Sequence, residues 1–358
     1  MIKILIVAEE TERNTFIKNL TDSLKSSCDV EFGIQKFWES ESNYDIIHFH
    51  WPEHLSFRIK RKSLPPTPNK LKKIKARIQD LKTGGAKLVL TRHNSQSHEY
   101  EKGFSKLYDY LNQVVDGVIH MGSYSVQEHS TLYPSSLSQH TIIPHGWYHD
   151  IPNTKTFESA RAKLGISAKA FVILAFGAIR NKEEEDFILE AFKKLDLPRK
   201  QLIIPRGFFF NNFLFFRLID YLKLNFYQKI IERKKKKLAP LNVQWDQKFT
   251  SKDEIQDYFN ASNVVLIPRL KILNSGNVPL AFYFQKLVIG PNQGNVGSIL
   301  KETGNLIFDV KSVDTLTNAM QKSISKTSKG TENYQFAKEN WNWRIIGQSH
   351  INFYSSLI

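Results

Sequence analysis

Short apolar runs alternate with longer amphipathic stretches, such as residues 11–27, along the first 146 residues of the chain. The runs have the length and composition of buried strands. Strands that alternate with helices in this way predict a parallel sheet with helices on both faces. The predicted strands are IKILIVA (2–8), YDIIHFHW (44–51), AKLVLTRHN (86–94), GVIHM (117–121) and HTIIPHG (140–146).

This alternation breaks at residues 147–160, a polar stretch with a proline that suits an interdomain linker. It then restarts with a predicted helix over 183–195, and Ser251 with Glu254 predicts a capping box for a later helix. The sequence therefore predicts two doubly wound α/β domains of similar size. The strands predicted for the second are AFVILAFG (170–177), QLIIPRG (201–207), NVQWDQKF (242–249), NVVLIPRL (263–270), KLVIGP (286–291) and NLIFDV (305–310).

Composition narrows the class of partner. The 358 residues carry a net charge of +15, which points to nucleic acid, an anionic membrane or phosphorylated substrates. The single cysteine, Cys28, can form no intrachain disulfide, so nothing requires an oxidising compartment. The first apolar run is too short for a signal-peptide core or a membrane span, and we expect a cytosolic protein.

Polar side chains accumulate where the predicted strands end, which is the edge where open α/β sheets bind ligands. A single histidine at a strand end is more often a satisfied structural residue, but recurrence at successive strands favours a binding site. These residues are His48, His50, Trp51, Arg92, His93, Asn94, His120, His145, Gly177, Arg180, Lys182, Arg206, Arg269, Ser275, Gly276 and Asn277.

The stretch LNSGNVPLAFYFQKLVIGP (273–291) predicts a loop, a short helix and a buried strand. Ser275, Gly276 and Asn277 lie where the helix begins, and Pro279 falls in its first turn, where a missing N–H costs nothing. Unpaired N–H groups and the positive end of the helix dipole favour an anion there. The alternative is an ordinary strand-to-helix turn.

Several motifs, in order along the chain, resemble those of the retaining family 4 glycosyltransferases, which have the two-domain GT-B fold. DIIHFHWPEH resembles the family's histidine-bearing strand end, and LVLTRHN is similar to its T-x-H loop. FGAIRNKEEEDFILEAF resembles its phosphate-binding element, and YFNASNVVLIPR the strand before its donor loop. The resemblance implies an acceptor-binding domain over 1–152, a nucleotide-sugar-binding domain over 153–339, and a C-terminal helix over 340–358 that packs back on the first domain.

The resemblance also implies a donor site on the second domain, where Arg180 and Lys182 hold the nucleotide diphosphate. Lys182 lies one place from the family's lysine, and its alternative interpretation is a solvated first helical turn. Fixed cations can stabilise a leaving diphosphate without a metal, and no cysteine or histidine cluster has metal-ligand spacing, so we expect neither metal nor other cofactor. The donor-binding candidates are Gly177, Arg180, Lys182, Ser275, Gly276 and Asn277.

The first domain supplies the catalytic candidate. His93 would seat the donor sugar in a retaining enzyme, whereas in an inverting enzyme His93, Glu9, Glu10 or Glu53 would accept the acceptor's proton. The candidates for acceptor or sugar binding are His50, Trp51, Glu9 and His145.

The chain departs from the family at a pair of glutamates that spans the donor loop and helix. Those places fall at about Ile272 and Leu280, neither of which can hold a ribose or sugar hydroxyl. This departure leaves the identity of the donor and the stereochemistry of transfer open.

Two segments concentrate the basic excess. Residues 58–87 contain Asp80 as their single acid, and we expect their proline-rich middle to be mobile. Residues 206–237 place six phenylalanines between Phe208 and Phe216 ahead of a lysine run at 234–237, which suits the surface of an anionic bilayer. The alternative is a helix packed on its own domain with a solvated lysine tail.

The sequence favours a cytosolic, membrane-associated glycosyltransferase that moves a sugar from a nucleotide donor to a lipid-linked saccharide in surface polysaccharide synthesis. A sugar-nucleotide epimerase of similar fold and a nonenzymatic scaffold are the alternatives. A nucleic-acid-binding protein is disfavoured, because the aromatic residues follow a helix and no RNP-like, zinc-finger or helix-turn-helix pattern is present.

Overall fold

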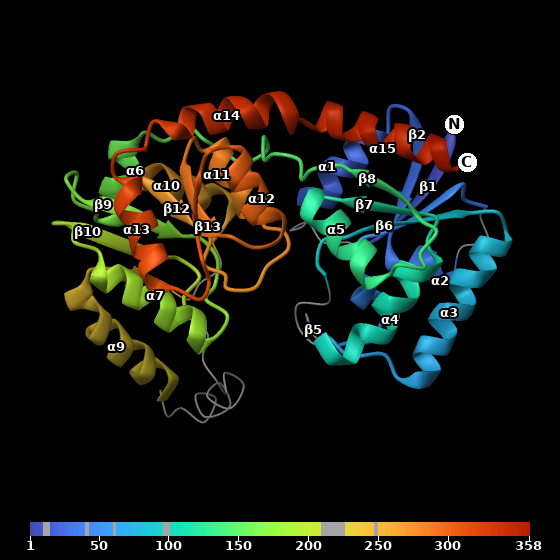
Figure 1. Ribbon diagram of the computed structural model, residues 1–358, viewed down its shortest axis with the longest axis horizontal. Helices are drawn as coiled ribbons and strands as arrows, with labels where there is room; N and C mark the ends of the chain where they lie inside the picture. Colours follow the sequence, from blue (N-terminus) through green and yellow to red (C-terminus); the bar gives the residue numbers. More distant parts are fainter. Residues whose placement is uncertain (10–14, 40–42, 60–61, 96–100, 209–225, 247–249) are drawn as a thin grey trace. The chain divides into compact units, whose positions relative to one another are not determined.

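The protein folds into two compact α/β units, seen in a computed structural model (Figure 1). Unit 1 comprises Met1–Gly146 and Asn340–Ile358, and unit 2 comprises Trp147–Glu339. Each unit contains a six-stranded parallel sheet, which confirms the predicted doubly wound fold class. The structure describes residues 1–9, 15–39, 43–59, 62–95, 101–208, 226–246 and 250–358.

The sheet of unit 1 has the strand order β2-β1-β3-β6-β7-β8. Its inner strands, such as β1, β3 and β6, are buried on both faces and are therefore continuous apolar runs, whereas the edge strands β2 and β8 are partly exposed. The strands are β1 (Ile2–Val7), β2 (Cys28–Phe32), β3 (Ile46–Phe49), β6 (Lys87–Thr91), β7 (Gly117–His120) and β8 (Gln139–Ile142), with a small hairpin of β4 (Arg58–Ile59) and β5 (Lys62–Ser63).

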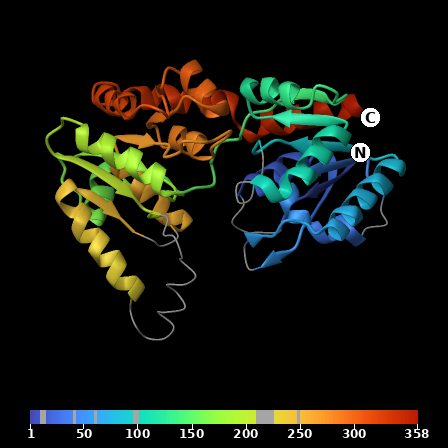
Figure 2. The same cartoon turned by 60° about the horizontal axis from the view of Figure 1, so that its bottom comes forward.

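Helices cover both faces of this sheet (Figure 2). Buried residues of α2, α3 and α4 pack with alternate residues of the strands, such as Leu5, Ile47 and Leu88, in one apolar cluster. Helices α1 and α15 pack against each other. The helices of unit 1 are α1 (Thr15–Leu24), α2 (Ile34–Glu39), η1 (Pro52–Leu55), α3 (Pro68–Thr83), α4 (Glu101–Val114), α5 (Ser123–Leu132) and α15 (Trp343–Leu357).

Unit 2 has the strand order β11-β10-β9-β12-β13-β14. The strands are β9 (Phe171–Ala175), β10 (Lys200–Ile204), β11 (Val243–Trp245), β12 (Val264–Leu266), β13 (Leu287–Pro291) and β14 (Leu306–Phe308). The helices are α6 (Phe157–Leu164), α7 (Lys182–Lys194), α9 (Phe226–Leu238), η2 (Ala239–Leu241), α10 (Lys252–Ala261), α11 (Asn277–Tyr283), α12 (Gly294–Glu302), α13 (Val313–Ser323) and α14 (Lys329–Asn340).

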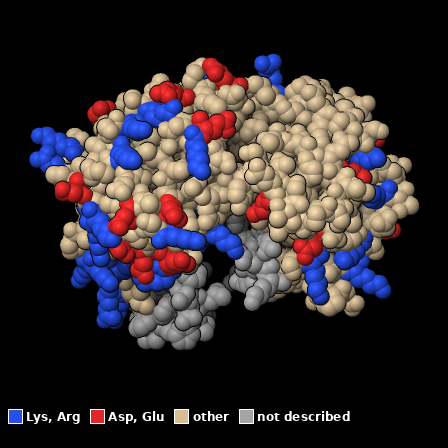
Figure 3. Space-filling model, in the orientation of Figure 1, with Lys and Arg blue, Asp and Glu red and all other residues tan. Residues whose placement is uncertain are grey.

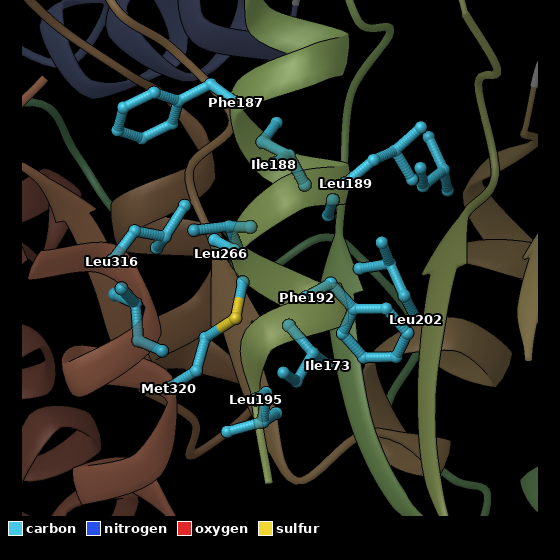
Figure 4. Packing of buried hydrophobic residues seen from close by; sticks show 14 of the residues in the cluster. Ile173, Phe187, Ile188, Leu189, Phe192, Leu195, Leu202, Leu266, Leu316 and Met320 are labelled. Atoms are coloured by element: carbon cyan, nitrogen blue, oxygen red, sulfur yellow. The ribbon is translucent and has the colours of Figure 1, made fainter. Parts of the chain in front are cut away.

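Helices α7 and α13 form the core of unit 2 with one face of its sheet. Phe187, Ile188 and Phe192 of α7 meet Leu316 and Met320 of α13 over the strands (Figure 4). Each fully buried side chain of this size stabilises the fold by about 1.5–3 kcal/mol. This core holds the first turn of α7 at the carboxyl end of β9.

Local capping explains three boundaries. The predicted capping box is confirmed, because Ser251 Oγ accepts a hydrogen bond from Glu254 N and the Glu254 carboxylate accepts one from Ser251 N. The polar stretch 147–160 is shorter as a linker than predicted, because Thr156 caps α6. Thr67 caps α3 in the same way, so a helix follows the proline-rich part of residues 58–87.

The C-terminal helix predicted over 340–358 is present as α15, which spans Trp343–Leu357 and so begins slightly later than predicted. The preceding helix, α14, ends at Asn340. Asn342 separates them, and its Oδ1 accepts a hydrogen bond from Ile345 N at 3.0 Å. Trp343 packs so closely on Gly146 that a Cβ there would lie 2.4 Å from the indole.

Candidate functional site

The strand order of unit 2 reverses between β9 and β12, the place where doubly wound sheets bind ligands beyond the strand ends. Gly177 follows β9 with φ of +122°, a conformation that favours glycine. A Cβ on Gly177 would lie 3.4 Å from Asn277 Nδ2 and 3.5 Å from Arg269 Nη2. The end of β9 therefore meets the stretch between β12 and α11, which lies far along the chain.

Three arginines gather at the same edge of the sheet. Arg269 follows β12 and is 9% exposed, whereas the side chains of Arg180 and Arg206 are exposed. Burial, followed by the charge of Arg180, lowers the pKa of Arg269 to about 10; the charge of Arg206 adds to this lowering, and Glu184 opposes it. A group of cations that disfavour one another in this way is suited to an anionic ligand.

Glu184 is the buried counter-charge of this arginine cluster. Its carboxylate is 3.3 Å from Arg269 Nη1 and accepts a hydrogen bond from Arg180 N at 2.8 Å. Asn181 caps α7 by accepting a hydrogen bond from Glu184 N, which fixes the glutamate in the first turn. The sequence contained a signal for this role, because Glu184 lies at the third position after an N-cap asparagine. The turn that contains it was instead interpreted as solvated.

Asn277 ties the donor loop to the end of β9. Its Nδ2 donates a hydrogen bond to Phe176 O at 2.5 Å. Two N–H groups at the start of α11 are used within the turn, because Asn277 N donates to Ser275 Oγ and Val278 N donates to Ser275 O. Gly276 precedes the helix in a right-handed conformation, with φ of −63°. Asn277 and Gly177 thus lie together beside Arg269.

Lys182 has a different environment from the arginines. It is the first residue of α7, and its ammonium pairs with Glu185 at 3.7 Å and with Asp186. The hydrogen bond that the Lys182 ammonium donates to the Asp186 carboxylate raises the pKa of Lys182, and the Lys182 side chain is 69% exposed. The structure places this charge among the carboxylates of the first helical turn, the alternative that the sequence left open.

Unit 1 presents histidines at the carboxyl ends of its strands. His50 follows β3, His93 follows β6, and His50 Nδ1 shares a hydrogen bond of 2.9 Å with His93 Nε2. Trp51 stacks on the His93 ring, with centroids 4.2 Å apart. His50 is 2% exposed, and its Nε2 has no partner among the described residues. Burial, followed by the charge of His48, holds the pKa of His50 well below its usual value, so His50 is neutral near pH 7.

Phe16 of α1 gathers these rings. Its centroid lies 5.7 Å from that of His50, 5.1 Å from His93 and 4.9 Å from His145. His145 Nδ1 shares a hydrogen bond with Gly146 O at 2.6 Å, and burial lowers the pKa of His145 to about 4. The structure therefore brings four predicted site residues into one histidine cluster: His50, Trp51, His93 and His145.

The carboxylate candidates of unit 1 differ in environment. Glu9 is half-buried just beyond β1, and Glu10 lies outside the described residues. Glu53 is 9% exposed and accepts a hydrogen bond of 2.5 Å from the hydroxyl of Tyr108, whose pKa is raised by burial and by the Glu53 charge. Glu53 is thus engaged by a core tyrosine.

Other strand-end residues are satisfied inside unit 1. Arg92 is 2% exposed and donates to Glu128 Oε2 at 2.9 Å and to Ser125 O. His48 shares hydrogen bonds of 2.7 Å with both Thr91 Oγ1 and the Tyr354 hydroxyl of α15. These residues follow the ordinary structural interpretation of a polar strand end.

Comparison with solved structures identifies the fold. HepE of Anabaena in complex with UDP matches with a TM-score of 0.70 and 13% identity, over 99% of this chain and 100% of that one. Sucrose-phosphate synthase from Thermosynechococcus elongatus matches with a TM-score of 0.67 and 14% identity, over 100% and 99%. The chain has a GT-B fold. A glycosyltransferase from Rickettsia africae matches with a TM-score of 0.67 and 14% identity, over 99% and 98%. No protein-family profile and no curated protein matches the chain by sequence.

In this GT-B chain the two glutamate places of the donor loop hold apolar side chains. Leu280 is buried at 4% exposure in α11, and Ile272 lies in the loop before it. Arg206 and Arg269, by contrast, carry charge to the switch point of the sheet and were noted in the sequence only as strand-end residues. Their clustering depends on the strand order, which the sequence pattern did not specify.

The described residues show no group of three or more histidine, cysteine or acidic side chains that could hold a metal ion. In the same residues no helix is long and apolar enough to cross a bilayer.

The aromatic and basic segment 206–237 is described only at its two ends, because residues 209–225 lie outside the described part of the chain. Phe208 is 4% exposed, and Lys234 Nζ lies 4.0 Å from its ring centroid and 2.5 Å from Glu185 Oε2. Lys234 is thus held within unit 2, whereas residues 235–237 are exposed on α9 (Figure 3).

Proposed function

We propose that the protein is a glycosyltransferase that takes its sugar from a nucleotide diphosphate donor. The arginine cluster of unit 2 carries this proposal. Three arginines and one glutamate leave a net charge of +2 at the switch point of the sheet, and this charge complements the dianionic diphosphate of a nucleotide sugar. HepE, which shares the fold, has been solved with UDP and with UDP-glucose.

The arginine cluster acts by binding and by electrostatic stabilisation. Arg180 and Arg206 donate to the phosphate oxygens, and Arg269 adds a fixed charge held by Glu184. Negative charge grows on the diphosphate as the bond to the sugar breaks, so fixed cations stabilise the transition state more than the ground state. Gly177 leaves room for the phosphates beside the backbone. The cluster performs this role without a metal ion.

The histidine cluster of unit 1 supplies proton chemistry and binds the acceptor. His93 is the catalytic residue of this proposal, and Trp51 presents an aromatic face to a sugar ring. His50 shares its hydrogen bond with His93 and fixes which nitrogen of His93 carries the proton. Glu9 and His145 complete the acceptor side.

The acceptor is a lipid-linked saccharide, and the reaction belongs to the assembly of surface polysaccharides at the cytoplasmic face of an anionic membrane. The net charge of +15 supports this location, as do the exposed lysines 235–237 on α9.

A panel of nucleotide diphosphates and nucleotide sugars tests the donor proposal by thermal shift. A ligand that binds the native state raises the melting temperature by mass action. We expect UDP or another nucleoside diphosphate to stabilise the protein and the matching nucleoside alone to have little effect. Equal stabilisation by the nucleoside would exclude a diphosphate site at the arginines. Epimerised free donor, formed without an acceptor, would assign the protein to the epimerases instead.

A further inference from the structure

A second group of cations lies on helices α3 and α4 of unit 1. Lys72, Lys75 and Lys106 line a cavity of about 480 Å³ formed by α3, α4 and the loop before α3. The rest of its described lining is uncharged and consists of Pro66, Pro68, Leu71 and Gly103. The lining of the cavity thus combines cationic and apolar side chains.

The lysines of this cavity have no carboxylate partner among the described side chains. Described side chains form no ion pair with Lys72, Lys75, Lys106 or the neighbouring Lys70 and Lys73. The pKa of Lys70 is lowered by burial and by the charge of Lys73, which shows that the ammonium groups disfavour one another. Figure 3 shows basic side chains over α3. An anion bound here would relieve this repulsion.

Aromatic rings, rather than carboxylates, position two of these lysines. Lys75 Nζ lies 4.5 Å from the ring centroid of Tyr110, and Lys70 Nζ lies 4.0 Å from that of Trp38. A cation–π contact restrains an ammonium group but leaves its net charge in place. A Cβ at Gly103 would lie 2.4 Å from Pro65 Cγ, so the proline loop rests directly on α4. The cavity is therefore built before any ligand arrives.

We propose that the lysine cavity binds the phosphate head groups of an anionic bilayer. Phe57 is 56% exposed and its ring centroid lies 5.3 Å from Lys70 Nζ, so an apolar side chain stands beside the cations. Lysines next to exposed aromatic and apolar surface suit the boundary between head groups and acyl chains. A soluble polyanion has no acyl chains to contact the exposed apolar side chain, so this side chain would not strengthen its binding. This inference rests on the proposed function, which gives the protein a reason to be at a membrane. It assigns a membrane contact to unit 1, in addition to the contact proposed for α9.

Sedimentation with vesicles of about three parts phosphatidylcholine to one part phosphatidylglycerol tests the proposal. The variant replaces three lysines, Lys72→Gln, Lys75→Gln and Lys106→Gln. Each lysine near an anionic surface contributes roughly a fivefold gain in binding, so partitioning should fall by about 100-fold at low salt. The matched control, Lys18→Gln, Lys25→Gln and Lys36→Gln, removes the same net charge from unit 1 at lysines paired with carboxylates. Its partitioning should change by less than about threefold.

Each remaining outcome overturns the proposal. Wild-type binding by the cavity variant, or an equal loss in the control, would mean that the cavity has no special role. Binding of wild type to heparin but not to these vesicles would assign the surface to a soluble polyanion. Phe57→Ser, an exposed substitution, provides a second arm and should weaken vesicle binding without changing the salt dependence. UDP-induced thermal shifts measured on the same variants report on the arginine cluster, so failure of the donor proposal is seen separately.

Discussion

The two units differ in the polar residues at the carboxyl ends of their strands. Ten of the eleven histidines belong to unit 1, and only His149 belongs to unit 2. The switch point of unit 2 instead gathers Arg180, Arg206 and Arg269. Burial lowers the pKa of His50 and His145, which are therefore neutral near pH 7, whereas arginines hold a fixed charge across the physiological range. The same strand-and-helix plan therefore carries a cluster of neutral histidines in one unit and a cluster of cations in the other.

The largest effect is expected from His93→Ala, which separates turnover from donor binding. General acid–base groups contribute about 10²–10⁴-fold to rate, so transfer should fall by at least about 100-fold. UDP affinity, measured by calorimetry, should stay within about threefold, because the arginines of unit 2 are intact. If the His93→Ala variant lost UDP binding but kept its turnover per bound donor, His93 would belong to the donor site and not to the catalytic step.

His50→Gln tests the histidine cluster through the pH dependence of turnover. Glutamine keeps a hydrogen-bonding group near His93 but does not fix the proton on one ring nitrogen. We expect a shifted pH profile of kcat with KM little changed, which a merely structural role would not produce. His50→Phe is the control that removes the hydrogen bond altogether and should lower kcat further.

Arg180→Ala should weaken UDP binding by roughly tenfold or more, since a hydrogen bond to a charged group is worth about 1.5–3 kcal/mol. Arg233→Ala is the matched control, because Arg233 is an exposed arginine of α9 in the same unit. Calorimetry at two salt concentrations would check the electrostatic origin. Equal affinity of the two variants would remove Arg180 from the donor site.

Mild acid should destabilise unit 1 before unit 2. Burial lowers the pKa of His350 to about 4 and that of His129 to about 3, where Arg92 also contributes. The unfolded chain takes up protons near pH 6.5 and the folded unit does not, so stability is complete above about pH 6.5 and declines as the pH falls toward 4. Hydrogen exchange at pH 7 and pH 5, corrected for intrinsic rates, should show faster opening in unit 1.

His129→Leu is the control for this acid effect. Neither ring nitrogen of His129 has a hydrogen-bond partner among the described residues, and its side chain is fully buried. Replacing such a group by an apolar one of similar size is close to neutral at pH 8, and it should gain about 1–3 kcal/mol at low pH. An unchanged acid response would mean that other groups control the opening of unit 1.

The smallest effect is expected from Lys182→Ala. Its ammonium is engaged by Glu185 and Asp186 in an exposed helical turn, and exposed pairs contribute about 0–1 kcal/mol. UDP affinity should change by less than about threefold. A tenfold loss would return Lys182 to the donor site and extend the arginine cluster along α7.

Local patterns predicted the parts of the fold that depend on near neighbours. Buried strands such as 171–175 and 287–291 lie within the predicted runs, because two-sided burial demands continuous apolar sequence. The C-terminal helix was predicted, but its start was placed too early, because the role of Asn342 as the N-cap was not recognised. The helix α3 was missed, because prolines before it obscured its N-cap at Thr67.

By itself the sequence determined the fold class, the phosphate-binding candidates at the strand ends and the concentration of histidines in the first 146 residues. Periodicity, capping and composition are local properties, and each can be read along the chain. Only the tertiary structure decided which polar residues act together. Strand order brought Arg269 and Asn277 to Gly177, placed the buried Glu184 beside Arg269, and paired His50 with His93. It also placed Arg92 and His48 inside unit 1, where Glu128 and Thr91 are their hydrogen-bond partners. Contacts between residues that are far apart in the chain follow from how strands are ordered and faces are packed, and the spacing of residues along one segment does not contain that information.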